Sequence, residues 1–428
     1  MQIAVLVVML FTMLLSIVFG WKLKLGKMQL SLYWIIVLLG AIVCIVCGWI
    51  DGQSLKAVFV SSSAINPLKI LIIFISLASL SVLLDELGFF SYLANVVLQK
   101  SKSSQTKLFV AFYIIISLLT IVTSNDIIIL TFTPFICYFA KRSNIDPTPY
   151  VVSEFVAANT WSNILIIGNP TNIYLATSFN INFLNYFLKM MLPTIVTGIV
   201  SFVILFLLFR KRLQAPINVP DDLQTVKLDK CLTWFVLSIL GVCIILMAIS
   251  SYIGLEMWYI PLLCGVVAIL GCLIVSAVRK EKPTYLLGTL HKLPYNLIPF
   301  LLSMAIIVST MDNLGYVNAF ADMISGLHPV LIGLIAFAVA NIVNNIPMSM
   351  LFTAIFSCFA VSGSAVYSAI FASNICAFFT PLGALAGIMF MNILRNNEVK
   401  FSYVDFVKYG SIVALPSLVA GLILIAVV

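Results

Sequence analysis

The sequence predicts an all-α polytopic membrane protein: an inverted repeat of five elements, with about ten spanning helices, two re-entrant hairpins and helices broken at mid-membrane. Three observations predict this fold: the composition, the placement of the basic residues, and motifs that recur in the two halves. Of the 428 residues, 62% are hydrophobic and 9% are charged, and the mean hydropathy is +1.17. A soluble globular domain carries far more charge, so a soluble protein is excluded.

Apolar runs recur along the whole chain. A helix needs roughly 20 mostly apolar residues to cross about 30 Å of hydrocarbon. We expect spans at residues 3–19, 30–50, 68–85, 151–177, 187–209, 231–250, 258–278, 293–311, 363–394 and 403–427. The longest polar stretch, residues 213–230, is too short for a domain. We therefore expect a first membrane repeat at 1–212, a cytoplasmic linker at 213–230, and a second, inverted repeat at 231–428.

Two further apolar stretches, residues 108–140 and 329–362, carry a polar cluster in the middle, Thr123–Asp126 and Asn341–Asn345. Each stretch is either one kinked helix or a hairpin that returns to the side it left. If both are hairpins, 20 of the 23 Lys and Arg residues fall on one side of the membrane. The positive-inside rule makes that side the cytoplasm. The net charge of +8 is then explained by topology and not by a nucleic-acid partner.

This charge pattern also predicts the location of the protein. We expect a multi-pass protein of the cytoplasmic (inner) membrane of a prokaryote, with both termini outside. The basic residues on the cytoplasmic side are Lys22, Lys24, Lys27, Lys100, Lys102, Lys107, Lys141, Arg142, Arg210, Lys211, Arg212, Lys227, Lys230, Arg279, Lys280, Lys282, Lys292, Arg395, Lys400 and Lys408. The three on the other side are Lys56, Lys69 and Lys189.

Paired motifs indicate that the chain is duplicated. Asp85–Phe89 (DELGF) and Asp312–Tyr316 (DNLGY) each close a span and precede a broken stretch. A Ser-Asn pair then precedes a proline, at Ser162–Pro170 and at Ser373–Pro381, and the proline comes seven positions after the Asn both times. Residues 30–209 and 258–427 therefore hold the same five elements in opposite orientation, each copy preceded by one extra helix. Inverted repeats of this kind are typical of secondary transporters.

Four points at membrane depth predict the binding site. Backbone that stops being helical inside a bilayer leaves amides and carbonyls unpaired unless they line a cavity or meet a ligand. Each repeat supplies one hairpin tip and one broken span. The candidate substrate- and ion-binding residues are Ser124, Asn125, Asp126, Gly168, Asn169, Pro170, Thr171, Asn344, Asn345, Thr380, Pro381 and Gly383.

The chemistry of these points favours small ions. Helix N-termini attract oxyanions, whereas carbonyl and Asn oxygens suit a cation. No Lys or Arg lies at any of the four points. We therefore expect an anionic substrate to be held by helix dipoles, by Asn and Thr donors and by a co-bound cation; a neutral polyhydroxy substrate fits equally well.

Carboxylates receive different interpretations according to their position. Asp126 lies at a hairpin tip, where an intramembrane acid indicates proton or sodium coupling; the alternative is a residue that only caps its half-helix. We expect Glu154 to be an interfacial charge near the cytoplasmic surface, and Asp85 and Asp312 to help turn the chain. No metal site or cofactor is expected besides H⁺ or Na⁺, because the nine cysteines lie mostly in apolar runs.

At these residues the chain resembles the arsenical-pump membrane proteins, within the superfamily of citrate, dicarboxylate and Na⁺/H⁺ carriers. The resemblance runs nearly end to end. The residues that carry it are Leu83–Phe90 (LLDELGFF), Asn125–Asp126 with Leu130–Pro134, Asn344–Pro347 (NNIP), Thr380–Ala386 (TPLGALA) and Tyr409–Pro416. One departure is Ala377–Phe379, where the arsenite pumps are expected to have Gly-Pro-Lys.

The resemblance implies that hairpin tips and broken spans carry substrate and ions between the two faces. It also implies a homodimer and, for an arsenite pump, a soluble ATPase partner. The leading expectation is a carrier, coupled to H⁺ or Na⁺, of a small oxyanion or metalloid such as arsenite or antimonite. A carrier of citrate, a dicarboxylate or another anion, or a Na⁺/H⁺ antiporter, is the alternative.

Two other classes fit the sequence less well. A channel needs a continuous polar stripe along its pore. An enzyme needs clustered His, Cys or acidic residues at one depth, and the only two histidines, His291 and His328, fall in predicted loops. We therefore expect no enzymatic activity.

Overall fold

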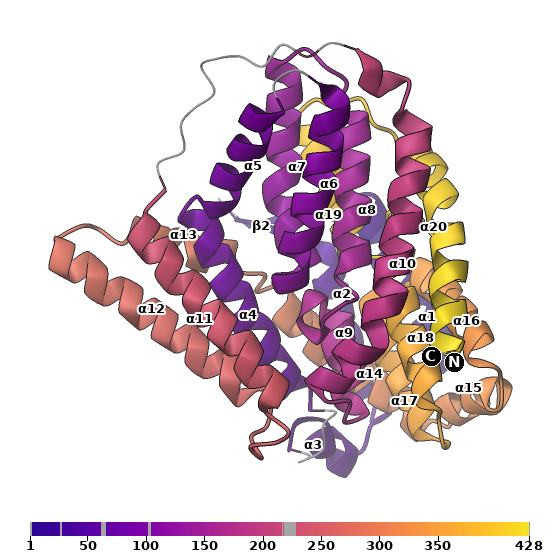
Figure 1. The fold of residues 1–428 in the computed structure, drawn as a ribbon. Helices are drawn as coiled ribbons and strands as arrows, with labels where there is room; N and C mark the ends of the chain where they lie inside the picture. Colours follow the sequence, from indigo (N-terminus) through magenta and orange to yellow (C-terminus); the bar gives the residue numbers. More distant parts are fainter. Residues whose placement is uncertain are drawn as a thin grey trace.

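The computed structural model describes residues 2–25, 28–60, 66–101, 104–215, 217 and 228–427. Over these residues the protein is a bundle of helices with one two-stranded ribbon (Figure 1). Lys27, Lys102 and Lys227, three of the basic residues assigned to the cytoplasmic side, lie outside the described residues, as does most of the linker.

The first half begins with α1 (Gln2–Val18), the ribbon β1 (Lys22–Leu25) and β2 (Met28–Ser31), and α2 (Leu32–Val46). It continues with α3 (Gly52–Val60), α4 (Pro67–Glu86), α5 (Phe89–Lys100), α6 (Gln105–Val122), α7 (Asn125–Arg142), α8 (Thr148–Trp161), η1 (Ile166–Gly168), α9 (Pro170–Ser178), α10 (Phe183–Phe209) and η2 (Arg212–Gln214). The predicted spans and the first hairpin are present. The short helices α3 and α5 and the ribbon were not predicted.

The second half repeats this order. It comprises α11 (Lys230–Ile249), α12 (Tyr259–Arg279), α13 (Thr284–Lys292), α14 (Leu297–Asn313), α15 (Tyr316–Ile324), α16 (Pro329–Val343), α17 (Asn345–Ser357), α18 (Gly363–Ile375), η3 (Cys376–Phe378), α19 (Leu385–Asn396) and α20 (Tyr403–Val427). Among the described residues, seven helical segments are long and apolar enough to cross a membrane by length and composition. Several of the others are halves of the predicted broken spans and hairpins.

The packing of the helices confirms the inverted repeat. In the repeat, α2 corresponds to α12 and α4 corresponds to α14. A two-fold relation between the halves therefore requires that a contact between α2 and α14 be matched by one between α12 and α4. Both contacts are present. In the same way α7 packs on α19 and α17 packs on α9, while α6–α8 matches α16–α18. Helices α10 and α20, which correspond to each other, pack together. The two halves are therefore interleaved and not merely adjacent.

The first hairpin returns to the side from which it came. Gln105 at its start donates a hydrogen bond to the Ala215 carbonyl at 3.1 Å, and Asp146 just after its end accepts one from Arg212 at 3.0 Å. Both ends of the hairpin therefore lie beside the segment that leads into the linker. Both chain termini lie toward the opposite end of the molecule, the lower end in Figure 1.

The duplicated DELG and DNLG motifs form the same turn. Gly88 and Gly315 precede α5 and α15 with φ of 82° and 78°, a left-handed conformation that glycine adopts at little cost. The glycines therefore make the turns for which Asp85 and Asp312 were expected to be important.

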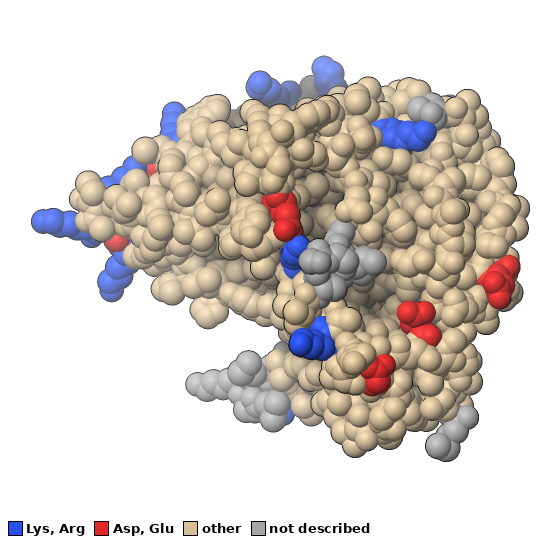
Figure 2. Space-filling view, turned by 90° about the horizontal axis from the view of Figure 1, so that it is seen from below, with Lys and Arg blue, Asp and Glu red and all other residues tan. Residues whose placement is uncertain are grey.

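Figure 2 looks onto the end that carries the termini and shows only scattered charged residues on an otherwise uncharged surface.

Candidate functional site

The tip of the first hairpin is a two-residue break. Helix α6 ends at Val122, and α7 begins at Asn125 after Thr123 and Ser124. The Asn125 amide Nδ2 donates to Asn159 Oδ1 of α8 at 2.9 Å. Asn125 Oδ1 is buried and has no hydrogen-bond donor among the described residues, and the same is true of Asn163 Oδ1 just beyond α8. Each of these two oxygens can accept a hydrogen bond or bind a cation.

The first broken span unwinds earlier than predicted. Helix α8 ends at Trp161 and α9 begins at Pro170, so Thr171 and Asn172 are already helical. Asn169 caps α9, because its Oδ1 accepts the Thr171 amide at 3.1 Å. A Cβ on Gly168 would lie 2.1 Å from the Ser162 carbonyl oxygen, so this position requires glycine.

In the second half-site, a single residue, Asn344, separates α16 from α17, with φ 78° and ψ 153°. The side-chain amide of Asn344 donates to the Leu382 carbonyl at 3.0 Å, and the backbone amide of Asn345 donates to the Gly383 carbonyl at 2.9 Å. The Thr380 hydroxyl donates to Asn341 Oδ1 at 2.7 Å. The structure therefore brings the second hairpin tip together with the break that contains Thr380, Pro381 and Gly383.

Asn374, at the end of α18, joins the two broken spans. Its Oδ1 accepts from Ser162 Oγ at 3.0 Å and from Asn169 Nδ2 at 2.8 Å, and its Nδ2 donates to Asn172 Oδ1 at 2.7 Å. Beside it the hydroxyls of Thr171 and Ser373 lie 2.8 Å apart. The candidate residues of the first broken span are thus tied to the second repeat.

The two breaks align in a different register from the one that the Asn-to-Pro spacing suggested. Pro170 begins α9, whereas Pro381 lies four residues before α19 begins at Leu385. A Cβ on Gly168 would lie 2.1 Å from the Ser162 carbonyl oxygen, and a Cβ on Gly383 would lie 2.2 Å from that of Cys376. Ser162 and Cys376 are the C-cap residues of α8 and α18, so the two glycines are the better markers of equivalence. The duplication is real, but the seven-residue spacing does not mark equivalent residues.

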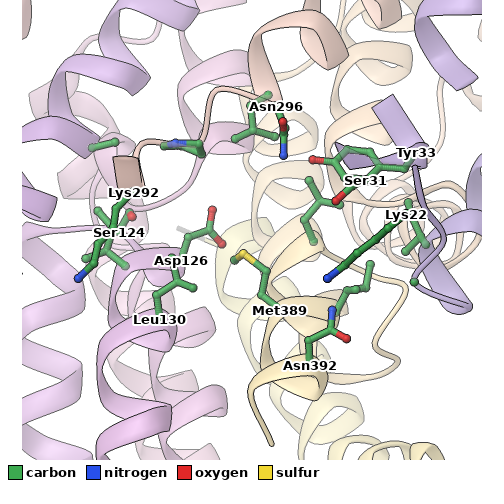
Figure 3. Close-up of a pocket in the computed structure, with 18 of the residues that line it drawn as sticks. Lys22, Ser31, Tyr33, Ser124, Asp126, Leu130, Lys292, Asn296, Met389 and Asn392 are labelled. Carbon is green, nitrogen blue, oxygen red and sulfur yellow. The ribbon is translucent and has the colours of Figure 1, made fainter. Parts of the chain in front are cut away.

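A cavity of about 290 Å³ lies next to the first hairpin tip. Ser124 at the hairpin tip and Asp126 of α7 line it together with Leu385 and Met389 of α19, and further residues come from α1, α2, α4 and α14. Figure 3 shows Asp126 on one side and Lys22 on the opposite side, with Met389 between them. The N-termini of α7 and α19, one from each repeat, therefore border the same cavity.

Two lysines reach this cavity, Lys22 and Lys292, although none lies at a helix break. Sequence reasoning missed them because both belong to segments that flank spans far from the tips along the chain. Asp126 makes no hydrogen bond or ion pair within the described chain, and the side chain of Ser124, the N-cap residue, accepts no hydrogen bond from the backbone amides of α7. The cavity thus offers both signs of charge beside two helix N-termini.

Lys292 is held by two carboxylates. Its Nζ lies 2.8 Å from Asp85 Oδ2 and 2.7 Å from Glu86 Oε1, and Asp85 Oδ1 accepts a hydrogen bond from Thr131 of α7 at 3.1 Å. Asp85 was expected only to help turn the chain, yet it links α4 to both α13 and α7. The pairing spans more than 200 positions, and no local signal predicts it.

Glu154 does not lie at the surface. The prediction of an interfacial charge is wrong, because the residue is 0% exposed in the middle of α8. The error arose because a position early in a span was equated with a shallow one. Helices α6, α7 and α10 pack against α8 instead.

Comparison with known proteins gives the family. The citrate transporter family (CitMHS) matches residues 14–369. The arsenical pump membrane protein of Escherichia coli K12 is 27% identical over 82% of this chain and 85% of its own length. The arsenical pump membrane protein of Yersinia enterocolitica is 26% identical over the same shares.

Solved structures give the same fold. The YdaH transporter of Alcanivorax borkumensis, whose crystal structure is described as having an unusual topology, aligns with 100% of this chain and 97% of its own at a TM-score of 0.58 and 13% identity. This likeness concerns the fold alone. Together with the family match and the inverted repeat, it leads to one conclusion: the chain belongs to the citrate transporter family and is a multi-pass membrane transporter.

Proposed function

We propose that the protein is a secondary active transporter that moves a small oxyanion or metalloid by alternating access, coupled to H⁺ or Na⁺. Arsenite and antimonite are the first substrates to test. One observation carries the proposal: the N-termini of α7 and α19, contributed by opposite repeats, border one cavity of about 290 Å³. Unpaired helix amides and the partial positive charge of each N-terminus favour a small oxyanion.

The cavity size supports a small substrate. Pockets for drug-sized ligands measure roughly 300–1,000 Å³, so this one is at the lower limit. One group of helices, α1, α2, α4 and α14, and a second group, α7 and α19, both contribute to its lining. Movement of the second group against the first would carry the substrate between the two faces, as rocking of one bundle against another does in inverted-repeat carriers.

The coupling ion is proposed to bind at the first hairpin tip. Asp126 has no cation partner among the described residues, and Asn125 Oδ1 and Asn163 Oδ1 lack donors nearby. Asp126→Asn keeps the size and removes the charge. We expect this variant to fold and to exchange substrate without a gradient, but to lose accumulation driven by a pH or sodium gradient. Unchanged gradient-driven accumulation would remove Asp126 from coupling.

A carboxylate such as citrate or a dicarboxylate is the second candidate, and the lysines favour it. Lys22 faces Asp126 across the cavity (Figure 3) and makes no ion pair in the part of the chain that is described. A carboxylate gains from such a cation, whereas a neutral hydroxylated metalloid does not. A charge-assisted hydrogen bond contributes about 1.5–3 kcal/mol, so Lys22→Gln should raise the KM for a carboxylate roughly tenfold or more.

A transport panel in proteoliposomes separates the candidates. Uptake of arsenite, antimonite, citrate and succinate is measured under imposed proton and sodium gradients, for the wild type, Lys22→Gln and the control Lys24→Gln, an exposed lysine of β1 that does not line the cavity. Gradient-driven metalloid transport that Lys22→Gln leaves unchanged supports the first candidate. Carboxylate transport weakened by Lys22→Gln alone supports the second. No gradient-driven transport of any of the four contradicts the proposal.

We further propose that the protein lies in the cytoplasmic (inner) membrane of a prokaryote with both termini outside. The positive-inside rule supports this orientation, because the topology inferred from the sequence puts 20 of the 23 Lys and Arg residues on one side of the membrane. Lys56, Lys69 and Lys189, on α3, α4 and α10, are the three that belong to the other end.

A further inference from the structure

Glu154 has surroundings that no role assigned so far explains. Its side chain is 0% exposed, at mid-length of α8. Thr133 Oγ1 of α7 donates to Glu154 Oε2 at 2.9 Å, and Glu154 Oε1 has no hydrogen-bond partner in the described chain. No salt bridge to it is present among the described residues. A carboxylate buried at this depth without a cation is much costlier than the neutral acid.

The charged residues of the neighbouring helices leave Glu154 without a counter-ion. The helices packed against α8 are α6, α7, α10, α18, α20 and η3, and α19 reaches it through Phe390, whose ring centroid lies 4.6 Å from that of Phe155. Their charged residues lie in the outer turns of those helices: Lys107, Asp126, Lys141, Arg142, Lys189, Arg395, Asp405 and Lys408. The tyrosines of these helices and of α8 are Tyr113, Tyr138, Tyr150, Tyr186, Tyr367, Tyr403 and Tyr409. The thiols on these helices are Cys137 of α7 and Cys376 of η3.

Glu154 belongs to a polar seam between α7 and α8. Thr133, Cys137 and Lys141 follow one another at intervals of four residues along α7 and lie in one row on that helix, whereas Asn125, eight residues before Thr133, is rotated from it by about 80°. Two of them bond to α8: Asn125 to Asn159, and Thr133 to Glu154. Eight residues of helix separate these two contacts, a rise of about 12 Å. The α7–α8 interface therefore holds both the hairpin-tip contact and Glu154, with the buried Ile129 between them on α7.

The same seam continues toward the end of the molecule that holds the linker. Cys137, one turn beyond Thr133, is itself part of the lining of a pocket of about 330 Å³. Lys141, Asp146 and Glu398 line the rest of it, and the exposed Lys141–Glu398 pair, 2.9 Å apart, lies at its mouth. The hydrogen bond from Lys141 lowers the pKa of the exposed Glu398 carboxyl. Water in this pocket would thus lie one helical turn from the Thr133–Glu154 bond.

We propose that Glu154 is a proton-binding site, distinct from Asp126, that exchanges its proton with the linker-side solution through the pocket lined by Cys137 and Lys141. The step is a simple proton transfer: hydronium protonates the carboxylate and leaves water, and the reverse step releases the proton. Because α7 also forms the hairpin tip, movement of α7 against α8 during the cycle changes the solvent access of Glu154. The link to transport rests on the proposed cation coupling, whereas proton binding itself does not.

The test measures proton binding in purified protein without substrate. Infrared difference spectra between two pH values report the carbonyl stretch of a protonated carboxyl, and proton uptake is followed with a soluble pH dye. The variants are Glu154→Gln, which keeps the shape; Thr133→Val, which removes the hydrogen-bond donor and leaves the carboxyl; and, as control, Thr353→Val, a buried threonine of α17 that bonds only its own helix. Thermal stability of each variant is recorded alongside.

We expect the wild type and Thr353→Val to show one carboxyl band that Glu154→Gln lacks, with one proton fewer taken up by that variant. Thr133→Val should move the midpoint of the band by at least half a pH unit. A spectrum of Glu154→Gln identical to that of the wild type would overturn the proposal. If Glu154→Gln does not fold, a band that Thr133→Val leaves unmoved has the same consequence. If these results are obtained but every transport assay fails, the proposed transport function is wrong and the proton-binding site at Glu154 stands.

Discussion

Replacing Asn374 by alanine should weaken the junction between the two repeats more than any other single change of an asparagine to alanine at a broken span. Asn374 makes three hydrogen bonds to the first repeat, with Ser162, Asn169 and Asn172, at 3.0, 2.8 and 2.7 Å. Hydrogen bonds between helices in membrane proteins contribute about 0.6 kcal/mol on average and about 1.7 at most. The three together amount to about 2–5 kcal/mol, a large part of a typical stability of 5–15 kcal/mol.

The measurement is unfolding of the purified protein in mixed micelles by a denaturing detergent, followed by tryptophan fluorescence. The control is Asn318→Ala, which replaces an exposed asparagine of α15. We expect Asn374→Ala to lose at least about 2 kcal/mol relative to this control. Asn374→Asp should be intermediate, because its oxygen can still accept from Ser162 and Asn169. Equal stability of Asn374→Ala and Asn318→Ala would refute the claim that this network joins the repeats.

Two further predictions concern topology and turns. Cysteines introduced at Lys100 and Lys141, in a background without the native cysteines, should both react with an impermeant thiol reagent from the same side, since the hairpin between them returns to its starting side; labelling from opposite sides would replace the hairpin by a crossing helix. Gly315→Ala should cost about 1–2 kcal/mol, because φ there is +78°. Gly241 lies within α11, and a Cβ added there has no atom within 4 Å, so Gly241→Ala should instead stabilise the protein by about 1 kcal/mol. If thermal unfolding showed the same change in stability for Gly315→Ala and Gly241→Ala, both expectations would be contradicted.

Most of the fold could be predicted from the sequence, because a chain in a bilayer must satisfy its backbone hydrogen bonds within its own helices, and this leaves few alternative folds. Polar clusters within apolar stretches predicted both hairpin tips, and the breaks lie at Thr123–Ser124 and at Asn344. The glycines and prolines at 168–170 and 380–383 predicted the broken spans for the same reason. The residues that interrupt a helix therefore predicted where the helices stop. The distribution of basic residues predicted on which side of the membrane each connecting segment lies.

Contacts between distant segments could not be predicted in the same way. Asn374 meets Asn169 across 205 positions, and Lys292 meets Asp85 across 207. Each of these residues has an ordinary local interpretation, as a repeat marker, a loop lysine or a turn residue. The sequence offered no signal for the cavity that brings Lys22 opposite Asp126 or for the burial of Glu154, because both depend on which helix faces which.

Transport by a variant that lacks both hairpin-tip asparagines tests the account most directly. Asn125 and Asn344 each hold their tip to a broken span, through Asn159 and through the Leu382 carbonyl. The double variant Asn125→Ala, Asn344→Ala is reconstituted beside the wild type and a double control, Asn185→Ala with Asn318→Ala. We predict that the wild type and the control accumulate one of the panel substrates under an imposed ion gradient and that the folded double variant does not. Full accumulation by the double variant would contradict the placement of the transport site at these tips.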